Sequence, residues 1–170
     1  MVTRYPTIDE LARMDTQAVF DHIAQHLLAQ GARSTHRLTG DCLYRSAKGR
    51  ACAVGCIIPD AVYSAAFEHS RITGLFWLLG KPEFRTAHHE LFCDFLLANC
   101  TLLTRLMVVH DCGAPRLWPL VLRDCADMFG LSAAVIDRYE GIVEPEASDG
   151  QAAHVTPERL VEHEASDVLA

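Results

Sequence analysis

The stretch from about residue 85 to residue 109 constrains the fold of this chain more than any other feature. It contains neither glycine nor proline, and apolar side chains fall nearly all round it when it is drawn as a helix. Its length approaches that of a membrane-spanning helix, but Asp94, Asn99 and Arg105 interrupt it, and each is costly at bilayer depth. We therefore expect the buried central helix of a globular protein and no membrane partner.

Helix signals also precede this stretch. Residues 7–10 have the spacing of a capping box, which predicts a short helix through Met14. Segment 17–30 has apolar residues at intervals of three and four and is followed by Gly31, as expected for an amphipathic helix. The apolar face of this helix consists of Val19, Phe20, Ile23, Ala24, Leu27 and Leu28.

Glycine and proline divide the rest of the chain into shorter helices. Residues 69–83 indicate a packed short helix and a turn, because their apolar run is followed by Gly80 and Pro82, which end helices. Residues 112–115 end the long helix and begin another, which Gly130 closes. Ser132 can cap a last short helix through Tyr139.

Three cysteines lie around a glycine-containing turn between residues 40 and 60. Cys42 and Cys52 are equidistant from Ala47, so a hairpin turning at residues 46–49 would place their thiols opposite each other. We therefore expect one small β-hairpin near residues 42–54. A two-stranded hairpin is only marginally stable in water by itself, so we expect it to pack against the helices.

The same segment carries a resemblance to a known group of proteins. The sequence Asp41-Cys42-Leu43-Tyr44-Arg45, followed by Cys52-Ala53-Val54-Gly55-Cys56-Ile57-Ile58-Pro59-Asp60, resembles small proteins of tailed bacteriophages and prophages that have no known activity. The resemblance covers roughly residues 16 to 130 and includes a His-Asp pair followed by a tryptophan, here His110, Asp111 and Trp118. It implies a source and a fold, and it transfers no catalytic residue.

The expected fold class is mainly α (α+β), a compact helical domain of five to seven helices with one small hairpin. This single domain spans residues 5–140. After Gly141 the composition shifts to Glu, Ala, Ser, Asp and Gly, and we expect residues 141–170 to form a flexible acidic tail.

Charge and cysteine content restrict the classes of function. The formal net charge of the chain is -7, with its carboxylates concentrated late, so nucleic-acid binding through a basic face is disfavoured. Seven cysteines are an odd number, and residues 1–16 contain charged side chains where a secretory signal would be apolar. These features favour a reduced, cytoplasmic protein.

Zinc is the first chemical hypothesis for the cysteine segment. Cys42, Cys52 and Cys56 supply three ligand types that zinc prefers, and His110, Cys112 or His36 could supply the fourth. No Cys-x-x-Cys pair anchors such a site. Free cysteines also commonly pack as small apolar residues, and the sequence favours that interpretation.

His110-Asp111 suggests a second hypothesis, a metal-dependent phosphohydrolase of the His-Asp type. His88 or His89 precedes the pair and Asp124, Asp127 or Asp137 follows it, so the order of residue types is met. The spacing argues against the site, because His88, His89 and His110 would share one helix. Alternatively, Asp111 accepts hydrogen bonds from the amides that open the turn before Pro115. The remaining enzymatic option is a Cys-His nucleophile pair, in which Cys42, Cys52 or Cys56 attacks and His110 is the base.

Resemblance and the lack of a reaction motif together predict a non-enzymatic accessory protein of a phage or prophage, binding a host or phage protein in the bacterial cytoplasm. The candidate functional cluster consists of Cys42, Cys52, Cys56, His110 and Asp111. The sequence assigns no catalytic residue, metal ligand or cofactor, and does not define an oligomeric state. The competing hypotheses are the His-Asp phosphohydrolase and a small zinc-binding protein.

Overall fold

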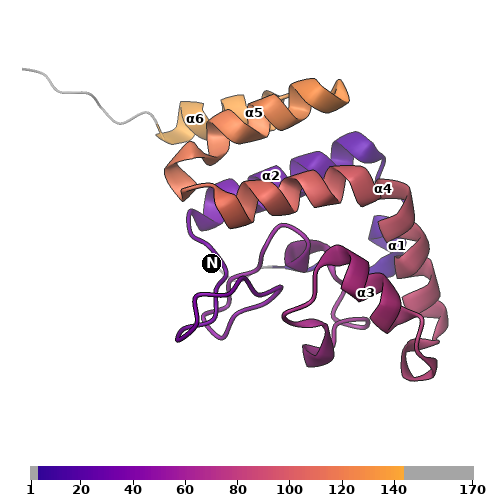
Figure 1. Cartoon of the computed structure of the whole chain (residues 1–170). Helices are drawn as coiled ribbons and strands as arrows, with labels where there is room; N and C mark the ends of the chain where they lie inside the picture. The colour runs from indigo at the N-terminus through magenta and orange to yellow at the C-terminus, as the bar shows by residue number, and fades with distance from the viewer. Residues whose placement is uncertain (1–3, 144–170) are drawn as a thin grey trace, which may run out of the picture.

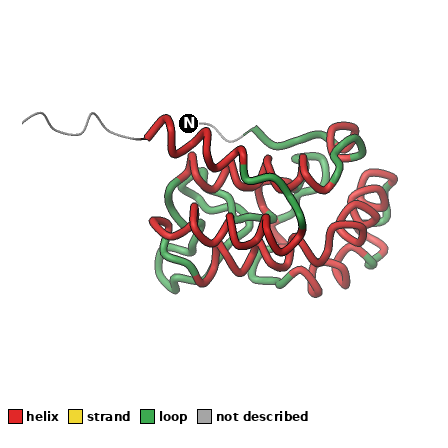
Figure 2. Tube along the Cα trace, turned by 90° about the horizontal axis from the view of Figure 1, so that it is seen from above, coloured by secondary structure: helices red, strands yellow, loops and turns green. Residues whose placement is uncertain are grey.

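The computed structural model describes residues 4–143, and this part of the chain is mainly helical, as predicted. Six α-helices are joined by loops and short 3-10 turns, with no strand among these residues (Figure 2). The helices are α1 (Ile8–Leu11), α2 (Thr16–Gln30), α3 (Ile72–Leu79), α4 (Ala87–Cys112), α5 (Trp118–Phe129) and α6 (Ala134–Val143), and the 3-10 turns are η1 (Gly55–Ile57), η2 (Ala65–Phe67), η3 (Pro82–Phe84) and η4 (Pro115–Leu117). The rest of the predicted acidic tail, residues 144–170, lies outside the described residues.

Local sequence signals set the ends of α1 and α2. The Glu10 amide donates to the Thr7 hydroxyl at 3.2 Å and the Thr7 amide donates to the Glu10 carboxylate at 2.7 Å, which confirms the predicted capping box. The Asp15 carboxylate caps α2 by accepting from the Ala18 amide. Gly31 ends the helix at φ 57°, in the left-handed region that glycine adopts without strain.

Helix α2 lies at the centre of the core. The six apolar residues predicted to form its inner face are all at most 3% exposed. Helices α5 and α6 form a layer on α2 and the second half of α4, whereas α1 and α3 pack on α4 (Figure 1). The loops of residues 31–71 cover the remaining side of α2, and this arrangement brings them against the C-terminal end of α4.

The long helix α4 is buried on one side only. Leu96 and Leu103 are fully buried, but Leu91, Leu97 and Val108 are 51%, 60% and 44% exposed. The expected buried central helix is therefore buried on one side and exposes apolar residues on the other. Of the helices described, α4 alone has the length and composition to span a membrane, and 33% of its most apolar window is buried in the protein.

Helix α4 also changes direction near its middle (Figure 1). The Asn99 amide group donates to the Phe95 carbonyl at 3.0 Å, so a side chain competes there with the backbone ladder of the helix. The first half of α4 consequently faces α1 and α3, and the second half faces α2 and α5.

The predicted β-hairpin near residues 42–54 does not form. Two isolated antiparallel bridges occur instead, Thr35 with Cys42 and Arg45 with Ala51. The predicted pairing of Cys42 with Cys52 is wrong, because Cys42 pairs with Thr35 and the Cys52 amide donates to the Tyr44 carbonyl at 3.0 Å.

Two contacts explain why no ladder extends along this segment. The Glu68 carboxylate accepts from the amides of Tyr44 and Arg45 at 2.8 and 2.9 Å, so those groups are not free to pair with a strand. Gly55 also lies directly against Tyr44, and a Cβ atom at residue 55 would be 1.8 Å from the Tyr44 carbonyl oxygen. The segment is thus a tightly packed loop, with residues 51–59 all buried.

Candidate functional site

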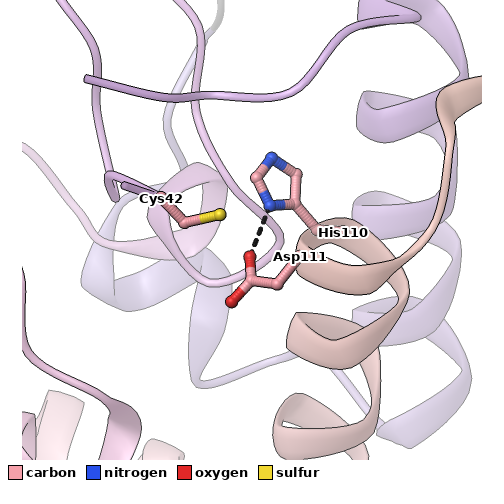
Figure 3. Close-up of side chains that lie close together, drawn as sticks. All are labelled: Cys42, His110 and Asp111. Atoms are coloured by element: carbon pink, nitrogen blue, oxygen red, sulfur yellow. Dashed lines mark hydrogen bonds and ion pairs between the residues drawn. The ribbon is translucent and has the colours of Figure 1, made fainter. Parts of the chain in front are cut away.

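Three of the five residues of the predicted cluster come together at the C-terminal end of α4. Ligand-type atoms of Cys42, His110 and Asp111 all lie within 4.8 Å of one another (Figure 3). His110 and Asp111 belong to the last turn of α4, and Cys42 comes from the loop that follows α2. The site therefore joins segments that are almost seventy positions apart in the sequence.

His110 is fully buried and uses both ring nitrogens. The Ser34 amide donates to Nε2 at 3.0 Å, so Nε2 carries a lone pair, and the proton of the neutral ring is on Nδ1. Nδ1 donates to Asp111 Oδ1 at 2.7 Å. The Trp118 ring stacks on the imidazole with 5.7 Å between ring centroids. His110 is consequently held in one tautomer and one orientation.

Asp111 receives the His110 proton and also lies beside the Cys42 thiol. Burial acts to raise the pKa of the Asp111 carboxyl, but hydrogen bonds from His110 and Cys42 lower it more, and the net pKa is below its ordinary value. Asp111 therefore stays ionised at neutral pH. The prediction that it accepts from the amides before Pro115 is not met, since its carboxylate accepts from His110 and Cys42 instead.

Cys42 is poorly suited to nucleophilic attack in this environment. Burial, together with the hydrogen bond and negative charge of Asp111, raises the pKa of the Cys42 thiol to about 12. A reactive cysteine needs the opposite shift, because the thiolate is the nucleophile. His110 cannot act as the general base for this thiol either, since its Nε2 already accepts a hydrogen bond from the Ser34 amide.

Cys52 and Cys56 do not join the three clustered residues. The Gly55 amide donates to Cys52 Sγ at 3.3 Å, and the Cys56 thiol donates to the Ala53 carbonyl at 3.2 Å. Burial raises the pKa of Cys52 to about 12 and that of Cys56 well above its ordinary value. Both act as packed core thiols, and all seven cysteines are free.

An open pocket of about 480 Å³ lies against Cys42 and Asp111. Asp41, His69 and Arg71 contribute charged or titratable side chains to its wall. His69 has φ 62°, a backbone conformation that is uncommon outside glycine. Tyr44 also lines this pocket, and its buried hydroxyl lies beside the Ser70 side chain without a hydrogen bond of normal geometry.

The sequence pointed to Cys42, His110 and Asp111 but not to Ser34, Asp41 or His69. Asp41 adjoins Cys42, and His69 has no pattern around it that would distinguish it from the other histidines. Conversely, His88 and His89 lie in the first turn of α4, at the end opposite to His110.

Other residues proposed for the phosphohydrolase are also outside the cluster. Asp124, Asp127 and Asp137 are exposed on α5 and α6, and none of them belongs to the group of clustered ligand atoms. The described residues therefore bring together a thiol, a carboxylate and an imidazole but no second histidine. Compared with protein-family models, curated proteins and solved structures, this chain has no match.

Proposed function

We propose that this chain is a non-enzymatic accessory protein of a bacteriophage or prophage, and that it acts in the bacterial cytoplasm by binding another protein of the host or the phage. Its source is inferred from the resemblance of residues 40–60 to small phage proteins. The binding role rests on one structural observation, the apolar side chains that α4 and α5 present to solvent.

Five of the eight exposed large apolar residues in the described structure lie on these two helices, which pack against each other. Single exposed leucines are common in soluble proteins, whereas a group of them on neighbouring elements favours an interaction site. These residues are Leu91, Leu97 and Val108 on α4 and Leu120 and Met128 on α5.

The polar cluster supports a non-enzymatic role because its strongest bases are occupied. Nε2 of His110 accepts from the Ser34 amide, and burial beside Asp111 keeps the Cys42 thiol protonated. Neither group is available to accept a proton from a substrate or to attack one. His-Asp phosphohydrolase chemistry would further need an imidazole from a second helix.

Site-specific photocrosslinking tests the binding role. A photoreactive amino acid is placed at residue 97 or residue 120 in bacteria that carry the phage, with Gln25, exposed on α2, as the matched control position. We expect one discrete protein adduct at residues 97 and 120 and none at residue 25. The purified partner should then bind Leu97→Glu or Leu120→Glu at least tenfold more weakly than wild type, and Gln25→Glu equally well.

Two results contradict this proposal. The first is the absence of an adduct, or an adduct equally strong at residue 25. The second is metal-dependent hydrolysis of phosphate esters by the purified chain that is lost in His110→Phe, which would support the phosphohydrolase instead.

A further inference from the structure

We propose that the pocket beside Cys42 and Asp111 is a zinc site, with Cys42, Asp111, Asp41 and His69 as its ligands and His110 as the residue that orients Asp111. The observation that carries the proposal is that Cys42 and Asp111, whose ligand atoms lie within 4.8 Å of each other, face a pocket of about 480 Å³ that Asp41 and His69 also line. This site is independent of the apolar surface proposed for protein binding.

The two inner ligands are already close together. Cys42 Sγ and an Asp111 carboxylate oxygen lie within 4.8 Å of each other, with the sulfur directed toward the carboxylate (Figure 3). Donor atoms in a tetrahedral zinc site lie roughly 3.5 Å apart, since each is about 2.0–2.3 Å from the metal. A small side-chain adjustment therefore brings both onto one ion.

His110 acts here as a positioning residue. Its Nδ1–H group holds Asp111 Oδ1 at 2.7 Å, and its Nε2 is fixed by the Ser34 amide at 3.0 Å. A metal on Nδ1 would require the proton to move to Nε2, where it would face the Ser34 N–H group. His110 is therefore not a ligand itself. It holds the ligand Asp111 in place, as hydrogen-bonded neighbours commonly do for metal-binding carboxylates.

Asp41 and His69 complete the donor set from the pocket wall. They bring an oxygen and a nitrogen donor, so that with Cys42 and Asp111 the site offers one sulfur, one nitrogen and two oxygens. Sulfur and imidazole nitrogen favour zinc over magnesium or calcium. The two carboxylates face two cationic side chains, Arg71 in the wall and Arg33, whose charge acts on Cys42 and Asp111.

A second observation at the same pocket points to a ligand. The Tyr44 side chain lines it and is only 3% exposed, and its hydroxyl has the Ser70 side chain beside it but makes no hydrogen bond of normal geometry. A buried hydroxyl without a well-formed hydrogen bond is energetically unfavourable. A hydrated ion in the pocket would give this hydroxyl a water or a ligand oxygen to bond.

Cobalt substitution tests the site, because cobalt(II) bound by a thiolate gives a charge-transfer band in the near ultraviolet. The full chain is reduced with a phosphine, stripped with chelator and titrated with Co²⁺, then with Zn²⁺. We expect one Co²⁺ per chain, a thiolate band that Zn²⁺ abolishes by displacement, and a rise in melting temperature on adding Zn²⁺.

Four variants identify the ligands. Cys42→Ser should lose the thiolate band, whereas Cys112→Ser, which removes an exposed cysteine at the C-terminal end of α4, should keep it. His69→Asn should bind Co²⁺ at least about tenfold more weakly, and asparagine tolerates the positive φ of residue 69. Asp111→Asn should weaken binding to at least the same extent.

Several results would overturn the proposal. These are no Co²⁺ binding by wild type, a band that persists in Cys42→Ser or disappears in Cys112→Ser, and unchanged affinity in His69→Asn. Because residue 69 is exposed, His69→Asn gives an answer even if Cys42→Ser or Asp111→Asn fails to fold.

Discussion

The amide of Ser34 donates a hydrogen bond to Nε2 of His110 at 3.0 Å, across 76 positions of the sequence. Arg33 strengthens the same junction, since its Nε–H group donates to the His110 carbonyl at 3.1 Å. Together these bonds attach the loop after α2 to the last turn of α4. The loop position in turn brings Cys42 to Asp111, so the candidate metal ligands depend on this attachment.

His110→Ala should destabilise the protein by about 3–5 kcal/mol. The substitution opens a cavity beside Trp118 and leaves the Ser34 amide without its acceptor. His110→Phe retains the volume and the stacking but loses both hydrogen bonds, so it should cost about 1–3 kcal/mol. Urea unfolding measures both values. The exposed His88→Ala is the control, with an expected change below about 0.5 kcal/mol, and a similarly small change at His110 would contradict its structural role.

The sequence predicts well those features that depend on neighbouring residues. The capping box of Thr7 and Glu10 and the inner face of α2 follow from spacings of three and four, which place side chains on one side of a helix. Leu96 and Leu103 are likewise buried, as expected for the long helix.

Features that depend on distant residues could not be predicted in this way. The hairpin fails because Glu68, more than twenty positions away, takes the amides of Tyr44 and Arg45. Nothing in residues 42–54 encodes that competition. Similarly, the composition of α4 does not reveal which side its neighbours cover, and Leu97 is left exposed. Cys42, His110 and Asp111 all belong to the predicted cluster, but their contact could not be predicted, because Cys42 reaches the other two through the path of a loop.

Gly55→Ala should lower stability by about 3 kcal/mol or more. The added Cβ would lie 1.8 Å from the Tyr44 carbonyl oxygen, and backbone atoms on both sides would have to separate. Thermal unfolding or the yield of soluble protein measures the effect. Gly80→Ala is the matched control, because its Cβ would meet its nearest neighbours at 3.5 and 3.6 Å, and we expect a change below about 1 kcal/mol. Equal stability of the two variants would show that residues 44 and 55 are not packed as described.

The Cys42 thiol should resist alkylation far more than an ordinary cysteine. A pKa of about 12, compared with the ordinary 9.0, reduces the thiolate fraction at pH 8 by about a thousandfold. The rate at Cys42 should therefore rise about tenfold for each pH unit between pH 8 and pH 11. Iodoacetamide labelling of the chelator-treated protein, followed by mass spectrometry of its peptides, measures each cysteine separately, and the exposed Cys112 provides an internal reference.

Asp111→Asn should accelerate the alkylation of Cys42, because it removes the negative charge that contributes to the raised pKa of this thiol. Burial of the thiol is the larger cause and remains in the variant, so Cys42 should still react more slowly than Cys112. Asp124→Asn, an exposed change on α5, should leave the rate at Cys42 unaltered. Equal rates at Cys42 in wild type and Asp111→Asn would mean that the carboxylate does not face the thiol, and the proposed pair of inner zinc ligands would fail with it.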